Sequence, residues 1–109
     1  MDMFYALAEP RRRKIIEMLA TNGQMSATEI SRNFRISPQA ISQHLRILLE
    51  TRLLRMEKHA QQHIYRVNPD SILELEAWVR QTKKLWDARF DRLDEVLKEE
   101  NRHSKKTKM

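Results

Sequence analysis

Two helix-start signals in close succession constrain this chain more than any other feature. In "SATEISRNF", Ser26 and Glu29 have the spacing of a capping box, in which each side chain accepts a hydrogen bond from the other residue's backbone N–H. In "ISPQAISQHLRILLE", Ser37 supplies a second cap, and Pro38 suits the first helical turn because its missing N–H is not needed there. Two short helices joined by a turn of a few residues predict a helix-turn-helix.

The two helices differ in what their faces carry. Ile30 and Phe34 give the first a short buried stripe, and the spacing of Ile41, Leu45 and Leu48 turns one side of the second toward the core. The opposite side of the second helix carries Gln39, Gln43 and Arg46. Gln pairs with the adenine edge and Arg with the guanine edge, so this face suits base reading. Both residues are also good helix formers, so a solvated face is the alternative.

Two strand-like runs follow the second helix. "LLRMEK" and "HIYRV" alternate in polarity, with Leu54, Met56, Tyr65 and Val67 as the apolar members, and they flank "HAQQ". A hairpin directly after a helix-turn-helix is a wing. Because its tip lacks glycine, we expect a turn wider than two residues.

The rest of the chain predicts one long helix over residues 72–100. Pro69 and the Ser71/Glu74 pair mark its start, with Asn68 or Asp70 as other possible caps. Apolar residues recur along it at the three-and-four spacing of a helix-packing seam, with one stutter. Two tryptophans on this helix, Trp78 and Trp86, fit an interface core better than a ligand pocket.

A core of 71 residues cannot bury so long a stripe, and the first helix also carries apolar residues that a monomer would leave underused. Pairing of two chains about a two-fold axis solves both problems; a helix that folds back on its own domain is the alternative. The predicted dimer interface consists of Phe4, Tyr5, Leu7, Ile72, Leu75, Val79, Trp86, Phe90, Leu93 and Leu97. We therefore expect a winged helix-turn-helix domain over residues 1–71, a dimerisation helix over 72–100 and a disordered basic tail over 101–109.

Composition agrees with a mostly α protein that has a small β-hairpin. One glycine and three prolines disfavour a turn-rich β fold, and the absence of cysteine excludes disulfides and thiolate metal sites. No uncharged apolar run approaches the ~18 residues of a membrane span. The N-terminus lacks the pattern of a signal peptide, so we expect a cytoplasmic protein.

The net charge of +6 lies in a middle segment and in the C-terminal tail, which carries Arg102, Lys105, Lys106 and Lys108. Residues 32–66 carry seven basic and two acidic side chains, whereas residues 72–100 carry six basic and eight acidic ones. A basic stripe around a helix-turn-helix favours double-stranded DNA as the partner. Ordinary solvated cations are the alternative.

Three motifs resemble the ArsR family of small winged-helix transcriptional repressors, over about residues 4–67. "LAEPRRRKII" is similar to the family's opening segment. "SATEISRNFRISPQAISQHLRILLETRLL" resembles its two central helices, with Ser42, His44, Leu45 and Leu48 in an "SxHLxxL" pattern. "HIYRV" resembles its second wing strand. The resemblance implies a homodimeric repressor that binds a roughly palindromic operator until a signal releases it.

The resemblance also implies which residues contact DNA. From the second helix these are Ser37, Gln39, Ala40, Ser42, Gln43 and Arg46, and from the wing Arg55, Lys58, His59, Gln61 and Gln62. Gln39, Ser42 and Gln43 match residues that reach the major groove, whereas Ser37 and Arg46 would touch phosphates or flanking bases. Arg12 has either a structural role beneath the recognition helix or a phosphate contact.

The chain departs from the family in ways that bear on regulation. It has no Cys-x-Cys metal site, and its last helix offers acids but no histidine before His103 in the tail, so we expect neither a metal nor another cofactor. An unidentified small molecule or protein could serve as inducer, and a regulator without one is equally open. Arg52 stands where the family has glycine, which predicts a strained or altered turn.

Catalysis is disfavoured because the chain has no phosphate-binding glycine loop, zinc-protease motif or nucleophile elbow, and because Ser42 and His44 lie about 200° apart on a helix. His44 is expected to be structural, whereas His59 suits a phosphate contact better than a metal site with His63. The main alternative function is a winged-helix protein-interaction module, which the polar basic recognition face disfavours.

Overall fold

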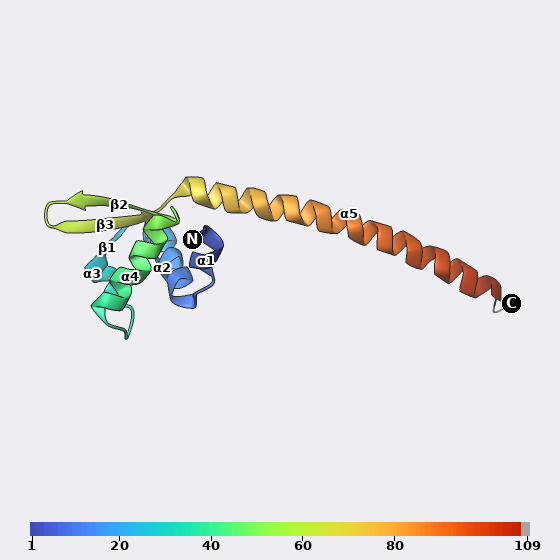
Figure 1. Ribbon diagram of the computed structural model, residues 1–109, viewed down its shortest axis with the longest axis horizontal. Helices are drawn as coiled ribbons and strands as arrows, with labels where there is room; N and C mark the ends of the chain where they lie inside the picture. Colours follow the sequence, from blue (N-terminus) through green and yellow to red (C-terminus); the bar gives the residue numbers. More distant parts are fainter. Residues whose placement is uncertain (108–109) are drawn as a thin grey trace. The chain divides into compact units, whose positions relative to one another are not determined.

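The computed structural model describes residues 1–107, with side chains described up to residue 99. Its elements are α1 (Met3–Leu7), α2 (Pro10–Asn22), β1 (Met25–Ser26), α3 (Ala27–Ser31), α4 (Pro38–Glu50), β2 (Leu54–His59), β3 (Gln62–Val67) and α5 (Pro69–Thr107) (Figure 1). The chain divides into one compact unit that ends at Ile72 and a second that begins at Leu73.

The first unit has one hydrophobic core, to which every helix from α1 to α4 and the sheet contribute. Its fully buried large side chains come from the predicted apolar faces and from the segment after α4: Ile15, Leu19, Ile30, Ile41, Leu45, Leu48 and Leu53. Burial of a side chain of this size stabilises a fold by about 1.5–3 kcal/mol. This core fixes α4 with one face inward and the other toward solvent.

Both predicted helix starts are confirmed. Ser26 Oγ accepts from the Glu29 N–H at 3.2 Å, and Glu29 Oε1 accepts from the Ser26 N–H at 3.2 Å, which completes the capping box of α3. Ser37 Oγ accepts from the Ala40 N–H at 3.1 Å, and Pro38 is the first residue of α4. Phe34 lies beyond the end of α3, but it is half-buried against the core.

The wing is confirmed as an antiparallel hairpin, but two of its details differ from prediction. Its turn has only two residues, because His59 pairs with Gln62 in the last rung of the ladder. Ala60 adopts a φ of 56°, so an alanine occupies a left-handed position that glycine fills at lower cost. The sheet also has a third strand, β1, in which Met25 pairs with Tyr65 of β3. A two-residue strand leaves no periodic signal in a sequence.

The turn after α4 is held by a Schellman motif. The Leu53 N–H donates to the Leu48 carbonyl at 3.0 Å and the Arg52 N–H to the Leu49 carbonyl at 3.1 Å. Leu48 and Leu53 are both fully buried, which supplies the apolar contact of that motif. Arg52 has a φ of 61°, so it takes the left-handed position at which the family resemblance predicts glycine.

The last helix is longer than predicted at both ends. It begins at Pro69, with Asn68 Oδ1 accepting from the Asp70 N–H at 3.2 Å, so Asn68 is the cap among the proposed alternatives. It runs to Thr107 rather than ending near residue 100, because residues 101–107 are polar but contain no proline or glycine to stop a helix. The last two residues of the predicted disordered tail lie outside the described residues. Within residues 1–107, no helix is both long and apolar enough to span a membrane.

Candidate nucleic-acid interface

The outward face of α4 presents four polar side chains together. Gln39, Ser42, Gln43 and Arg46 are all exposed and line one shallow hollow along the helix. Within the described residues, none of their side chains is engaged in a hydrogen bond or an ion pair. Donors and acceptors that are exposed, held on a rigid helix and free of internal partners are available to an external ligand.

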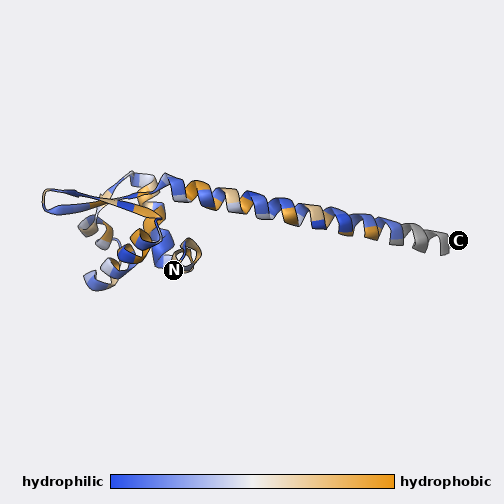
Figure 2. Cartoon of the chain, turned by 45° about the horizontal axis from the view of Figure 1, so that its top comes forward, coloured by the Kyte–Doolittle hydropathy of each residue, from blue (hydrophilic) through white to orange (hydrophobic). Residues whose placement is uncertain are grey.

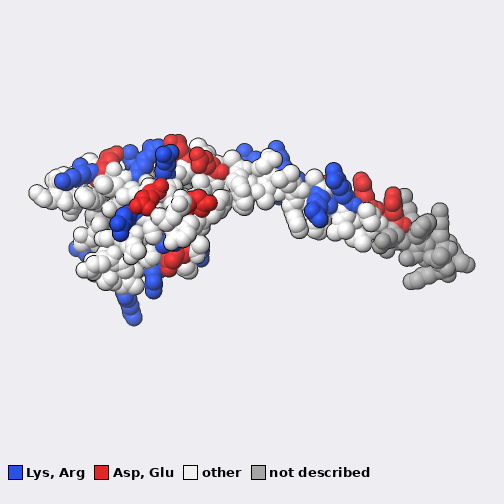
Figure 3. All heavy atoms as spheres, viewed as in Figure 1, with Lys and Arg blue, Asp and Glu red and all other residues white. Residues whose placement is uncertain are grey.

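The start of α4 lies beside this face. Ser37 caps the helix and is exposed, whereas Ala40 is half-buried between the cap and the polar face. Basic side chains project from this end of the first unit, where α3 and α4 meet, and from the wing (Figure 3). Acidic side chains lie among the basic ones on the face of the unit that Figure 3 shows.

The wing residues divide between two faces of the hairpin. The register places Lys58 on the same face as Leu54 and Tyr65, which pack into the core, while Arg55 and His59 lie on the opposite face. Gln61 is in the turn and Gln62 begins β3. The sequence pattern showed that these residues alternate, but it did not show which face turns toward the helices.

Arg55, one of the predicted DNA contacts, has an internal partner. Its Nη2 donates to Asp70 Oδ2 at 2.8 Å, which joins the base of β2 to the first turn of α5. Glu57 similarly holds Arg66 at 2.7 Å and lies 3.3 Å from His59 Nε2. Lys58 has no ion pair within the described residues, so it is the wing cation most available to a phosphate.

Of the two roles that the sequence allowed for Arg12, a structural role or a phosphate contact, the structure supports the structural one. It is only 7% exposed, its Nε donates to the Ala6 carbonyl at 2.8 Å, and its Nη2 donates to the Tyr5 carbonyl at 3.2 Å. Its Nη1 lies 3.3 Å from His44 Nδ1, and its guanidinium lies over the Tyr5 ring, 5.3 Å from the centroid. One buried cation therefore links α1, α2 and α4.

This link shifts two titrating groups. Partial burial, followed by the nearby positive charges of Arg12 and Arg11, lowers the pKa of His44 below its usual value, and the opposing effect of Glu9 does not reverse this. For Glu9, partial burial acts to raise the pKa. The backbone N–H groups of Arg12 and Arg11 donate to its carboxylate and outweigh that effect, so the pKa is lowered. The neutral imidazole and the ionised carboxylate are both favoured.

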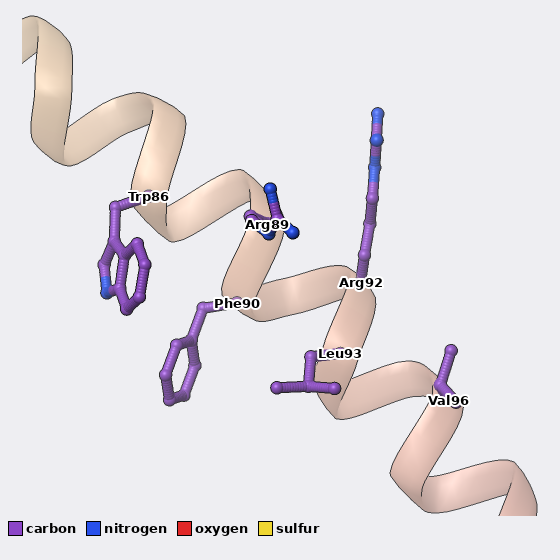
Figure 4. A pocket seen from close by; sticks show the side chains of 6 residues that line it. All are labelled: Trp86, Arg89, Phe90, Arg92, Leu93 and Val96. Carbon is purple, nitrogen blue, oxygen red and sulfur yellow. The ribbon is translucent and has the colours of Figure 1, made fainter.

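The predicted dimer-interface residues are mostly exposed apolar side chains. Hydrophobic positions recur along α5 between hydrophilic ones (Figure 2). Trp86 is 63% and Phe90 is 57% exposed, and their rings lie 6.1 Å apart. These two side chains and Leu93 project to one side of the helix, whereas Arg92 projects to the other (Figure 4). Also exposed are Phe4, Tyr5, Val79 and Leu97, while Leu7, Ile72 and Leu75 are half-buried.

No group of three or more metal-ligating side chains occurs among the described residues. His59 and His63 lie on opposite faces of the wing, so the structure does not bring them together as the metal interpretation required. The site is therefore a polar, basic protein surface built on one helix and one hairpin.

A helix-turn-helix whose second helix exposes hydrogen-bonding side chains, followed by a basic wing, defines the winged-helix class of DNA-binding regulators. The sequence profile of the bacterial regulatory proteins of the arsR family matches residues 9–55. The transcriptional repressor SdpR of Bacillus subtilis is 32% identical over 78 residues, which cover 72% of this chain and 86% of that protein. The protein belongs to the ArsR family.

Solved structures agree with this assignment. The crystal structure of a possible transcriptional regulator for arsenical resistance is 33% identical, with a TM-score of 0.69 over 75% of this chain and 84% of that one. The solution structure of a homodimeric winged helix-turn-helix DNA-binding domain from Mycobacterium bovis has a TM-score of 0.59 at 24% identity, with 73% of each chain covered. The fold class and the resemblance predicted from sequence are confirmed.

Proposed function

We propose that the protein is a repressor that binds a palindromic operator as a homodimer, with α4 in the major groove. The observation that carries this proposal is the unengaged polar face of α4. Gln39 and Gln43 lie one helical turn apart, so both amides point toward the same groove edge. Each can form two hydrogen bonds with an adenine, and Arg46 can do the same with a guanine.

The remaining contacts would position α4 rather than read sequence. Ser37 and Arg46 lie at the two ends of the face, where phosphates flank a bound helix. Lys58 would reach a phosphate from the wing, and His59, Gln61 and Gln62 lie near the tip of the same hairpin. We assign Arg55 a smaller part than Lys58, because its guanidinium is already paired with Asp70.

Dimerisation would use the apolar side chains of α1 and α5. Trp86, Phe90 and Leu93 form a continuous apolar surface on α5, larger than a solvated helix needs. A second copy of the chain would cover this surface most simply. The neighbour from Mycobacterium bovis is itself homodimeric. Residues 1–71 would then bind DNA, and the helix from residue 72 would join the two copies. Two recognition helices related by a two-fold axis would enter successive major grooves about 34 Å apart.

The test is selection of bound duplexes from a random-sequence library, followed by fluorescence anisotropy on the selected duplex and on a scrambled one. We expect a palindromic sequence with half-sites centred about 10–11 base pairs apart. Gln39→Ala and Gln43→Ala should each weaken binding to the selected duplex by about 1–3 kcal/mol, with a much smaller loss on scrambled DNA. Gln24→Ala, an exposed glutamine outside this face, is the matched control.

Two outcomes would contradict the proposal. Equal losses on the two duplexes would make the glutamines positioning groups rather than base readers. Failure to enrich any sequence, with salt-sensitive binding to all duplexes, would remove sequence-specific recognition altogether and favour the protein-interaction module.

A further inference from the structure

Arg12 connects α1 to the recognition helix α4, two elements that are distant in sequence. Its guanidinium accepts nothing and only donates, so each of its three polar contacts is a donation. Two of them go to carbonyls at the C-terminal end of α1, those of Ala6 and Tyr5. The Tyr5 carbonyl also accepts from the Ala8 N–H at 3.3 Å. The third goes to His44, directly beside Gln43 on the recognition helix.

The geometry also fixes the state of the histidine ring. Because Arg12 Nη1 can only donate, His44 Nδ1 at 3.3 Å must accept, and the ring must be neutral with its proton on Nε2. A protonated ring has no lone pair on Nδ1 and would place two cations in contact. Protonation therefore converts this contact from an attraction into a repulsion.

We propose that Arg12 is a positioning residue for the recognition helix, which it orients through the neutral ring of His44, and that protonation of this ring breaks this contact and weakens operator binding. This inference rests on the proposed function. It gives the protein an acid-sensitive connection between α1, part of the proposed dimer interface, and the helix that reads DNA.

The charged groups around His44 support the sign of the effect. From α2 and its cap, Arg12 and Arg11 oppose a positive ring, and Glu9 favours it. The α1 helix contributes only Tyr5 as a titratable group, and the one acid of α3, Glu29, is engaged in its own capping box. The net result is a lowered pKa, so the ring is neutral at pH 7 and gains its proton only below its usual value of 6.5.

The predicted effect of low pH on DNA affinity is opposite to the effect that histidine protonation usually has. Protonation of an exposed histidine adds positive charge and strengthens the attraction between the protein and DNA phosphates. Loss of the contact between Arg12 and His44 should instead make operator binding weaker. If binding requires the neutral ring, affinity falls by up to about tenfold per protomer for each pH unit below the pKa of His44.

The experiment therefore uses a variant in which the other three histidines are replaced: His59→Gln, His63→Gln and His103→Gln. Its affinity for the selected operator duplex is measured by anisotropy at pH 7.5, 6.5 and 5.5 at constant ionic strength. The comparison protein carries His44→Asn in addition. Asparagine Oδ1 takes the place of Nδ1 as acceptor but does not titrate, so we expect similar affinity at pH 7.5 and loss of the acid weakening.

Stability must be followed at the same pH values, because the folded ring binds its proton more weakly than an unfolded one. Stability from this group is complete above about pH 6.5 and declines as the pH falls below that value. The melting temperature of each protein is therefore recorded, and affinities are compared only where both proteins remain folded. Acid weakening that His44→Asn leaves unchanged would overturn the proposal, as would no weakening at all.

A second measurement tests the contact without DNA. The ¹⁵N chemical shifts of the His44 ring at pH 7.5 report which nitrogen carries the proton. A proton on Nε2 is expected, and a proton on Nδ1 would overturn the contact with Arg12. If the library enriches no operator, the proposed function fails, while this measurement still decides whether the link between Arg12 and His44 exists.

Discussion

Arg52 provides the sharpest test of the physical reasoning, because its backbone and side chain make separable contributions. Its φ of 61° lies in the left-handed region, where a β-carbon crowds the following carbonyl at a cost of about 1–2 kcal/mol. Its side chain is exposed and makes no hydrogen bond or ion pair within the described residues. Its carbonyl accepts from Asn68 Nδ2 at 2.8 Å and from Ser71 Oγ, and these contacts need no side chain.

We therefore expect Arg52→Gly to stabilise the protein. Relief of the left-handed strain is partly offset by the greater freedom of glycine in the unfolded chain, which leaves a net gain of about 0.5–1 kcal/mol. For a unit of this size, the gain corresponds to a rise of about 2–8 °C in melting temperature. Circular dichroism at 222 nm, at one fixed protein concentration, is the assay, since dimerisation would make the midpoint depend on concentration.

The matched control is Arg52→Ala. It removes the same charge and the same long side chain but keeps the β-carbon, so its stability should stay within about 0.5 kcal/mol of the parent protein. A glycine variant no more stable than the alanine variant would refute the reasoning. The strain would then be absent, or the loss of the arginine side chain would matter more than the backbone.

Three other substitutions test the wing and the helix. Ala60→Gly should stabilise the hairpin by about 0.5–1 kcal/mol for the same reason, and slower amide exchange in the wing would show it; unchanged exchange would argue against strain in the turn. Trp86→Glu places a charge on the proposed dimer surface, so sedimentation velocity should show a monomer, and a persistent dimer would contradict the interface. Lys58→Ala should lower the slope of log affinity against log salt concentration by about 1 for each protomer. Arg55→Ala should change this slope less, because Arg55 is paired with Asp70. A larger change for Arg55→Ala would mean that Arg55 leaves its ion pair to bind phosphate.

Most of the features that the sequence predicted correctly depend on residues close together in the chain. The capping box of Ser26 and Glu29 and the Ser37-Pro38 start are formed within four residues, so their chemistry is complete in the sequence itself. The apolar face of α4 follows from helical periodicity, and its outward polar face follows by exclusion. These features were enough for the helix-turn-helix and for the family resemblance. The DNA contacts and the dimer interface remain predictions.

Tertiary contacts decided the rest, because each joins groups too far apart in the chain for any local pattern to report. β1 is a strand only because β3 supplies its partners, with Met25 opposite Tyr65. Arg55 belongs to an ion pair only because α5 brings Asp70 to the base of the wing.

The same distinction applies to the buried cation. The sequence placed Arg12 near the recognition helix but left its role open, since a guanidinium suits a phosphate and a carbonyl equally well. Its burial beside His44, 32 residues away along the chain, settles the role through contacts that exist only after folding. Helix caps and faces are set by neighbours within a few residues, so the sequence determines them. The partners of buried charges and the register of strands depend on contacts between segments that are distant in the chain, so only the tertiary structure decides them.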